Sequence, residues 1–177
     1  MINIITGRRG VGKTTLLLKL VEEQKKQGSQ LSGIMTPAIY DEDGNKVGFY
    51  AFDAANGDCW ELGRSDKELD GPGYGPFSFN ERGFTIANDI LKKALVKDSK
   101  TVIIDEIGPL ELEKGFGFFP VLSLISSLNQ NSNLYLVIRS ELIDEFIHRF
   151  ISENEYKIIE ITLENREEID VLSNLCY

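Results

Sequence analysis

The amino-acid sequence predicts an α/β fold in which a mostly parallel sheet is flanked by helices. Strand-like and helix-like patterns alternate along the 177 residues. Several strand-like segments are short apolar runs, as expected of parallel strands buried on both faces. Glycines separate the first such run from the first helix pattern, as in a strand–turn–helix unit. With 42% hydrophobic and 27% charged residues, the chain suits one globular domain over residues 1–177.

The start of the chain predicts a strand followed by a helix. Residues 2–5 (Ile-Asn-Ile-Ile) form an apolar run, and residues 14–26 place apolar side chains at helical spacing. The side chains on one face of this helix are Leu16, Leu17, Leu20 and Val21. Gly28 stands where a helix commonly ends, because glycine adopts the left-handed conformation of the terminal residue.

The next segment predicts a β-hairpin over residues 34–52. Residues 32–40 are apolar and rich in strand-forming residues, and residues 47–52 form a second run of this kind. Between them, residues 41–45 (Asp-Glu-Asp-Gly-Asn) are a strong turn sequence.

A long irregular segment is predicted after this hairpin. A turn at residues 55–58 leads to a short strand at 59–62, and residues 63–76 form a loop rich in glycine, proline and charge. Loops of this length in a compact domain are often functional or mobile. We therefore expect residues 34–80, approximately, to be an insertion into a regular alternation of strands and helices.

The second half of the chain continues the alternation. Strands are expected at residues 101–105, 134–138 and 156–162, and helices at 81–96, 118–128, 140–150 and 166–175. Ser140 is expected to cap the helix that it begins, because a serine hydroxyl can accept a bond from a free backbone N–H.

Residues 7–14 (Gly-Arg-Arg-Gly-Val-Gly-Lys-Thr) fit the phosphate-binding loop pattern of Gly, four residues and Gly-Lys-Ser/Thr. The glycines let backbone N–H groups turn inward around an anion, and the following helix directs its positive N-terminus at that anion. Lys13 can reach the β- and γ-phosphates of a nucleotide, and the Thr14 hydroxyl can bind Mg²⁺. The nucleotide-binding residues expected here are Gly7, Arg8, Arg9, Gly10, Val11, Gly12, Lys13, Thr14 and Thr15.

Two acids lie at the end of the strand predicted at residues 101–105: Asp105 is its last residue, and Glu106 follows it. Asp105 would lie at the carboxyl end of a parallel strand, where α/β sheets bind ligands. In phosphate-loop enzymes such an acid helps to hold Mg²⁺, so we expect Thr14 and Asp105 to form the metal site. Glu106 can orient a water and accept its proton during attack on the γ-phosphorus. Glu106 and Lys13 are therefore the first two candidate catalytic residues.

The residues expected near the γ-phosphate favour hydrolysis over transfer to a second substrate. Glu106 can activate water, whereas a kinase often needs a cationic lid, and residues 63–80 carry only Arg64 and Lys67 as cations. Arg139 follows the strand at 134–138. If that strand neighbours the one ending at Asp105, Arg139 faces the phosphates and is the third candidate catalytic residue.

Other residues with useful chemistry are better explained by structural roles. His148 is the only histidine, it lies beside Arg149 in a helix, and no cysteine or second histidine is near it in the sequence. A surface or half-buried structural role is therefore expected. Trp60, Phe77 and Phe79 have rings that can stack on a base, but aromatic residues in a β-rich insertion are more often part of the core.

The composition disfavours several kinds of partner. The 19 Lys and Arg against 28 Asp and Glu give a net charge of −9, which disfavours nonspecific binding to nucleic acid or anionic membrane. No apolar run approaches membrane-spanning length, and no signal peptide is visible. Cys59 and Cys176 form neither a metal-ligand spacing nor a disulfide framework, which indicates a reduced compartment. We expect a cytoplasmic protein, and the sequence identifies no protein partner.

With both motifs in view, the chain resembles the small phosphate-loop nucleoside-triphosphatases first described from thermophiles, a family that includes the cancer-related nucleoside-triphosphatase. The resemblance extends along nearly the whole chain. Its most specific element is residues 105–112 (Asp-Glu-Ile-Gly-Pro-Leu-Glu-Leu). The other segments that carry it are residues 7–16, 33–37, 47–49, 71–72 and 164–166.

The resemblance implies a P-loop fold with a RecA-like sheet, in which a catalytic Glu follows the metal-site Asp. It implies Mg²⁺-dependent hydrolysis of ATP, GTP and other nucleoside triphosphates, with Asp105 as the metal partner and Glu106 as the base-like residue. It also implies that Asn165 and Arg166 lie near the nucleobase.

Two departures from the family pattern bear on rate and substrate preference. Many members have Gly-Lys-Tyr where this chain has Gly-Pro-Phe at residues 75–77, and many have His-Arg where it has Ile138 and Arg139. Two other functions also fit the sequence. The first is a kinase for a small nucleoside or nucleotide, and the second is a nucleotide-switched module that docks a biosynthetic or transport partner through residues 34–76.

Overall fold

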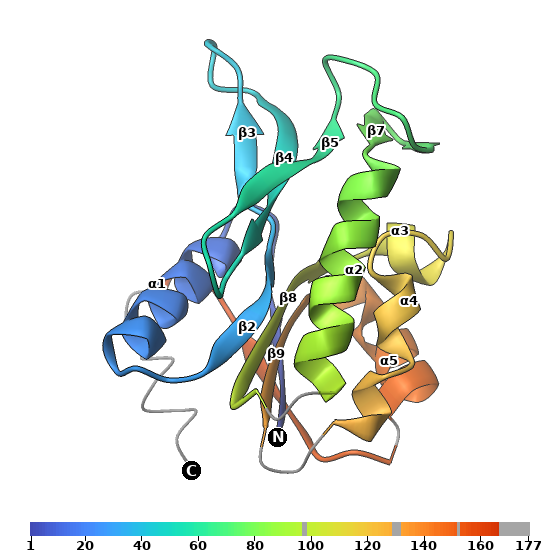
Figure 1. The fold of residues 1–177 in the computed structure, drawn as a ribbon. Coiled ribbons are helices and arrows are strands. Elements are labelled where there is room, and N and C mark those ends of the chain that lie inside the picture. The colour runs from blue at the N-terminus through green and yellow to red at the C-terminus, as the bar shows by residue number, and fades with distance from the viewer. Residues whose placement is uncertain (97–98, 129–131, 152, 167–177) are drawn as a thin grey trace.

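The structure is a computed structural model that describes residues 1–96, 99–128, 132–151 and 153–166 (Figure 1). In this part of the chain the strands form one ten-stranded sheet. The strand order is β10-β1-β9-β8-β2-β4-β5-β7-β6, with β3 paired to β4.

Five strands of this sheet pair in parallel. They are β1 (Ile2–Thr6), β2 (Leu31–Met35), β8 (Thr101–Ile107), β9 (Asn133–Ile138) and β10 (Tyr156–Glu160). Every residue of β1 is buried, as are nearly all residues of β8 and β9, which explains their continuous apolar runs. Because the strands are parallel, their carboxyl ends meet at one edge of the sheet.

The other half of the sheet is antiparallel, so the sheet is mixed and the prediction of a mostly parallel sheet is corrected. Its strands are β3 (Ala38–Tyr40), β4 (Lys46–Asp53), β5 (Cys59–Arg64), β6 (Gly73–Tyr74) and β7 (Phe77–Phe79). Figure 1 shows them rising above the parallel half. The predicted insertion therefore extends the sheet through strands of its own.

The predicted hairpin is displaced along the sequence. Ile34 and Met35 belong to β2, which pairs in parallel with β8 as well as antiparallel with β4. The hairpin itself is β3 and β4, and its predicted turn at residues 41–45 is confirmed. Asn45 donates its backbone N–H to the Asp41 carboxylate at 2.7 Å, and Gly44 has a φ of 80°. The boundary between β2 and β3 is not evident in the sequence, because residues 32–40 are apolar on both sides of it.

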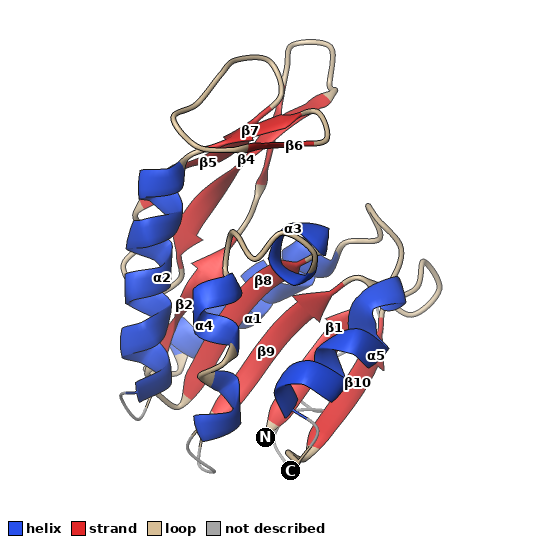
Figure 2. Ribbon diagram, turned by 90° about the vertical axis from the view of Figure 1, so that its right-hand side faces the viewer, coloured by secondary structure: helices blue, strands red, loops and turns tan. Residues whose placement is uncertain are grey.

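Helices cover both faces of the parallel half (Figure 2). Helix α1 (Lys13–Lys26) packs Leu16, Leu17, Leu20 and Val21, the predicted face, against one side of the sheet. Helices α2 (Glu81–Val96), α4 (Phe119–Leu122) and α5 (Ile143–Phe146) cover the other side. Each fully buried Leu or Ile contributes about 1.5–3 kcal/mol. Gly28, with a φ of 67°, follows the end of α1 as predicted.

Two predicted helices differ in form. The segment 118–128 contains α4 and then a separate 3-10 turn at Ile125–Ser127, where the Ser126 hydroxyl donates to the Ser123 carbonyl. The segment 140–151 is helical but changes from a 3-10 turn (Ser140–Leu142) through α5 to a π turn (Ile147–Ile151). The Ser140 hydroxyl donates to Glu141, so Ser140 does not cap the helix. The predicted helix at 166–175 lies almost wholly outside the described residues.

An additional short helix, α3 (Pro109–Leu112), begins directly after β8. No helix among the described residues is both long enough and apolar enough to cross a membrane.

Candidate functional site

The loop between β1 and α1 has the strand–loop–helix context that the sequence predicts. Gly7, Gly10 and Gly12 have φ angles of 138°, 79° and 107°, which side chains rarely tolerate. A Cβ at Gly7 would also lie 2.3 Å from the carbonyl oxygen of Ile161. Gly12 immediately precedes α1, so the loop ends at the positive end of that helix.

The ammonium group of Lys13 lies against this loop. It donates to the carbonyl oxygens of Gly7 at 2.7 Å and Arg8 at 3.0 Å. Burial lowers the pKa of Lys13, and the nearby carboxylates of Glu106 and Asp105 oppose that change. The positive charge is thus held between the loop and the acid pair, where a bound polyphosphate would be neutralised.

Asp105 is completely buried and joins three segments of the chain. The Thr14 hydroxyl donates to its Oδ1 at 3.4 Å. Thr36, directly after β2, donates to its Oδ2 through both the backbone N–H at 2.9 Å and the hydroxyl at 3.2 Å. Burial raises the pKa of Asp105 to about 6, although the Thr36 N–H opposes this. The structure therefore brings Thr14 and Asp105 together, as predicted.

Thr36 is a site residue that the sequence reasoning missed. It follows an apolar parallel strand, just as the loop glycines follow β1, and the carboxyl ends of such strands share one edge of the sheet. That position is the available signal, but the apolar pattern of residues 32–40 predicts one arm of a hairpin instead.

The atoms at Thr14 and Asp105 suit Mg²⁺. Mg²⁺ prefers hard oxygen ligands and is commonly held by one or two carboxylates together with substrate phosphates. A hydroxyl and a carboxylate lie side by side here, next to the loop expected to bind phosphates. Within the described ranges no group of three or more His, Cys, Asp or Glu forms a separate metal cluster. The donor set thus fits a metal shared with a nucleotide.

Glu106 has an unusual backbone conformation. Its φ of 68° is the only positive φ of a non-glycine residue among those described. The pairing of β8 with β9 is interrupted at the same point, between Ile104 and Ile107. A left-handed conformation of this kind costs about 1–3 kcal/mol and is concentrated at functional sites. The Glu106 side chain remains 41% exposed, and so it is open to a ligand.

Arg139 lies beside Glu106. Strand β9 neighbours β8, as the prediction for Arg139 required, and Arg139 Nη2 lies 3.4 Å from Glu106 Oε1. The two side chains are 46% and 41% exposed, so the ion pair is weak and can be exchanged for a ligand. The structure therefore brings Lys13, Asp105, Glu106 and Arg139 to one edge of the sheet.

Glu111 is a second residue that the sequence reasoning did not single out. Glu111 lies in α3 and is 3% exposed. Its carboxylate accepts the backbone N–H groups of Gly108 at 2.8 Å and Phe118 at 3.2 Å. Burial raises the pKa of Glu111 to about 7 against these two hydrogen bonds. It fixes the segment that follows Glu106. Its position three residues after Gly108, as in a capping box, was the available signal.

We predict that the free energy of unfolding decreases as pH rises from about 5 to about 8. The folded pKa of Glu111, about 7, lies above its ordinary value of 4.5, so the folded protein holds the proton more tightly and loses stability as the pH passes through this window. The Glu111 contribution is on the order of 1–3 kcal/mol. Burial also raises the pKa of Asp105, so this carboxyl likewise lowers the free energy of unfolding as the pH rises.

Urea titrations across this pH range check the prediction. Glu111→Gln is expected to flatten the pH dependence, whereas Glu113→Gln, at an exposed neighbouring position, keeps it. Equal slopes for wild type and Glu111→Gln would contradict the assignment.

Two cavities flank the phosphate loop. One, of about 450 Å³, lies on the β10 side between residues 8–11 and residues 160–164. The other, of about 420 Å³, lies on the side of β9 and β8 and includes Glu106 and Arg139 in its wall. The loop thus separates two spaces, each large enough for part of a ligand.

Asn165 and Arg166 lie beyond the end of β10, near the first cavity. The Asn165 side chain holds the turn there, because it accepts the Thr162 N–H at 2.7 Å and donates to the Glu160 carbonyl at 3.0 Å. Arg166 is exposed, and its backbone N–H donates to Thr162. Their contact with a nucleobase stays a prediction.

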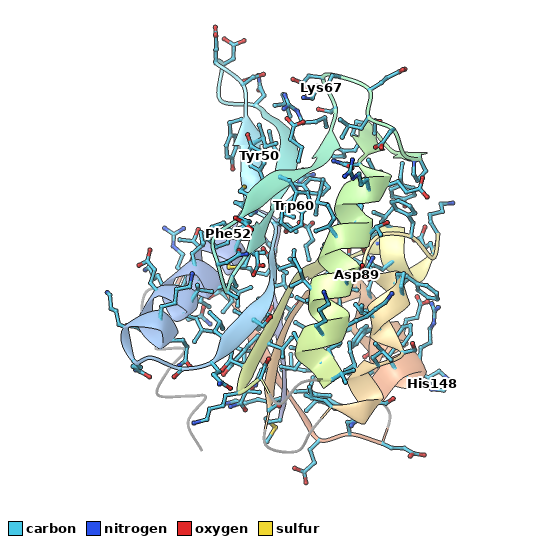
Figure 3. The ribbon with its side chains drawn as sticks, in the orientation of Figure 1. Tyr50, Phe52, Trp60, Lys67, Asp89 and His148 are labelled. Atoms are coloured by element: carbon cyan, nitrogen blue, oxygen red, sulfur yellow. The ribbon has the colours of Figure 1, made fainter. Side chains whose placement is uncertain are left out.

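Two of the residues expected to be structural, His148 and Trp60, line neither cavity. His148 is exposed on the outside of the helical segment after β9 (Figure 3). Trp60 donates its ring N–H to the Gly83 carbonyl at 3.0 Å and so attaches β5 to α2. Phe79 is buried in the core and Phe77 is half-buried, and both line the second cavity.

Comparisons with known proteins agree with this geometry. A family model described as NTPase matches residues 3–172. The nucleoside-triphosphatase THEP1 of Ignicoccus hospitalis is 36% identical over 166 residues, covering 93% of this chain and 89% of the relative. The protein of the same name from Sulfurisphaera tokodaii is 32% identical over 169 residues, covering 94% and 88%.

Solved structures show the same architecture. The crystal structure of THEP1 from the hyperthermophile Aquifex aeolicus matches with a TM-score of 0.73 and 29% identity over the whole of both chains. The solution structure of a human cancer-related nucleoside triphosphatase matches with a TM-score of 0.71 and 24% identity over 98% of this chain and 96% of that one, which shows a shared fold. The family match spans the phosphate loop, the acid pair and nearly all of the chain, so this protein belongs to the NTPase family.

Proposed function

We propose that the protein hydrolyses nucleoside triphosphates, including ATP and GTP, to the diphosphate and free phosphate with Mg²⁺. The observation that carries this proposal is the meeting of Lys13, Thr14, Asp105 and Glu106 at the end of α1. Residues 7–14 and 105–106 are distant in sequence, yet Thr14 and Asp105 lie within 3.4 Å. The family membership supports the same reaction class.

Each residue has a role that follows from its position. The N–H groups of residues 7–14 bind the phosphates, and Lys13 exchanges its two carbonyl partners for the β- and γ-phosphate oxygens. Thr14 and Asp105 hold Mg²⁺, which supplies charge neutralisation on the phosphates when bound. Glu106 orients the attacking water and accepts its proton. Arg139 stabilises the charge that develops on the transferred phosphoryl group.

We place the nucleoside in the cavity formed by residues 8–11 and 160–164. This cavity adjoins the phosphate loop on the side away from Glu106 and Arg139, so a triphosphate that points its γ-phosphate at Glu106 directs its nucleoside there. Asn165 and Arg166 follow this wall directly in the sequence, and we propose that they reach the nucleobase. The exposed side chains Leu163 and Glu164 suit contact with a base that is only weakly selected.

The RecA-like assignment is supported by the order of the parallel strands. One strand, β9, lies between β1, which carries the phosphate loop, and β8, which carries Asp105. That arrangement leaves Arg139, at the end of β9, between the two motifs.

A phosphate-release assay tests the proposed function. Purified protein is incubated with each nucleoside triphosphate and Mg²⁺, without a second substrate, and free phosphate is measured. Release from several nucleotides, and its loss when EDTA removes the metal, is the expected result. The proposal fails if the γ-phosphate appears only on an added nucleoside or nucleotide acceptor, or if no phosphate is released.

We predict that Arg139→Ala lowers kcat by roughly 10–100-fold, because the developing negative charge loses the side-chain cation that lies beside Glu106. Arg149→Ala is the comparison variant, since Arg149 also pairs with a glutamate, Glu145, at 2.6 Å, and it donates to the Leu112 carbonyl at the end of α3. Steady-state kinetics measure kcat for both variants and for the wild type. An unchanged kcat in Arg139→Ala removes Arg139 from the mechanism.

A further inference from the structure

The cavity beside Glu106 has the size and lining of a ligand site. Its volume is about 420 Å³, within the roughly 300–1,000 Å³ of typical small-molecule pockets. Aromatic rings form much of its wall: Phe49, Tyr74, Phe77, Phe79, Phe84 and Phe118. Phe49 contacts both Phe77 and Phe79, with ring centres 5.7 Å and 6.1 Å apart. Such walls favour a flat, largely apolar occupant.

This cavity is built by contacts between its two walls. The Tyr74 hydroxyl, in the insertion, donates to Glu113 at 3.3 Å, and the Lys114 ammonium lies 5.7 Å from the centre of the Tyr74 ring. On the opposite wall, Glu111 holds the backbone at Gly108 and Phe118. The shape therefore follows from specific interactions between the insertion and the segment after β8.

Among the described residues, one cation of the insertion, Lys46, lines the cavity without an acidic partner. Glu106 is already paired with Arg139, and Glu111 accepts two backbone N–H groups. Lys46 lies 5.4 Å above the ring of Phe49 and has no ion pair within the described residues. An occupant with one anionic group would meet favourable electrostatics.

We propose that this cavity is a second ligand site, distinct from the nucleotide cradle, for a small, flat, largely apolar molecule that carries one anionic group. The aromatic walls hold the flat body, and Lys46 holds the anion. Because Glu106 and Arg139 line the same cavity, an occupant sits where the attacking water is placed by the proposed function, and this coupling rests on that function.

A fluorescence titration without nucleotide tests the site directly. The probe is 1-anilinonaphthalene-8-sulfonate, which combines flat aromatic rings with one sulfonate. We expect saturable binding of one molecule per chain. Lys46→Ala and Phe77→Ala are each expected to weaken binding about fivefold or more, since each removes one charged or one aromatic wall contact.

Matched controls separate this site from general surface binding of the dye. Lys25 lies 6.0 Å from the ring of Phe52 outside the cavity, so Lys25→Ala is the control for Lys46→Ala. Phe150 is half-buried against Phe146 and Phe119, so Phe150→Ala is the control for Phe77→Ala. Non-saturable binding, or equal weakening in the variants and their controls, overturns the proposed site.

The same dye tests the coupling to hydrolysis. At saturation it is expected to lower phosphate release several-fold while leaving the Kd of a non-hydrolysable nucleotide unchanged. If the dye bound specifically but phosphate release did not change, the ligand would not occupy the position of the attacking water, and that part of the proposal would be overturned. A protein that binds the dye specifically but releases no phosphate would overturn the proposed function and leave the ligand site supported.

Discussion

Glu106→Gln is expected to lower kcat by about 10²–10⁴-fold and to leave nucleotide affinity nearly unchanged. The amide keeps the size of the side chain but cannot take a proton from water. It also leaves the backbone at Glu106, with its φ of 68°, under the same strain as in wild type, so the fold should persist. Single-turnover phosphate release and binding of a non-hydrolysable analogue measure the two quantities separately.

Glu145→Gln is the control for this prediction. Glu145 also pairs with an arginine, Arg149, but lies on α5 away from the site. Its substitution should leave kcat within about twofold of wild type. If Glu106→Gln hydrolysed as fast as wild type, Glu106 would have no role with the water.

Lys13→Met is expected to reduce both nucleotide affinity and turnover, with kcat lower by about 10²–10³-fold. The ammonium group now bonded to the Gly7 and Arg8 carbonyls is the charge closest to the expected β- and γ-phosphates. Methionine retains most of the aliphatic chain but removes that charge. Calorimetric titration with an analogue and the phosphate-release assay measure the two effects.

Lys19→Met serves as the control, because Lys19 is an exposed lysine on the same helix. Without nucleotide, the Lys13→Met variant must also melt near the wild-type temperature. This control shows that a loss of binding does not come from a loss of folding. Wild-type affinity in a folded Lys13→Met protein would contradict the assigned position of the phosphates.

The phosphate loop and Asp105 could be predicted from sequence because their geometry is determined locally. The glycines of residues 7–14 require positive φ angles, and an apolar parallel strand delivers Asp105 to the edge where the loop also lies. The proximity of Thr14 and Asp105 follows from the parallel pairing of strands, which the alternating pattern already indicates.

Thr36 and Glu111 could not be assigned in the same way, since their roles depend on tertiary contacts. Thr36 reaches Asp105 only because β2 pairs with β8, and the apolar pattern of residues 32–40 is equally compatible with a hairpin. Glu111 looks like an ordinary acid in a short helix. Its burial and its bonds to Gly108 and Phe118 arise from the packing of α3 against the core.

The mixed sheet and the backbone conformation of Glu106 also depend on tertiary structure. Periodicity identifies strands but not their partners, so the sequence predicts a hairpin and a strand at 59–62 but not that they extend the parallel sheet. The left-handed Glu106 also has no sequence signal, because propensity disfavours that conformation for glutamate. It is the residue on which the proposed chemistry most depends.

The most direct measurement is a crystal structure with Mg²⁺ and an ATP analogue that has an imido group between its β- and γ-phosphates. The triphosphate is predicted to lie in the turn of residues 7–14, with Lys13 moved from Gly7 and Arg8 to its oxygens. The metal is predicted between Thr14 and Asp105, and the γ-phosphate beside Glu106. A triphosphate bound elsewhere, or one in the turn with Asp105 and Glu106 remote from it, would contradict the account.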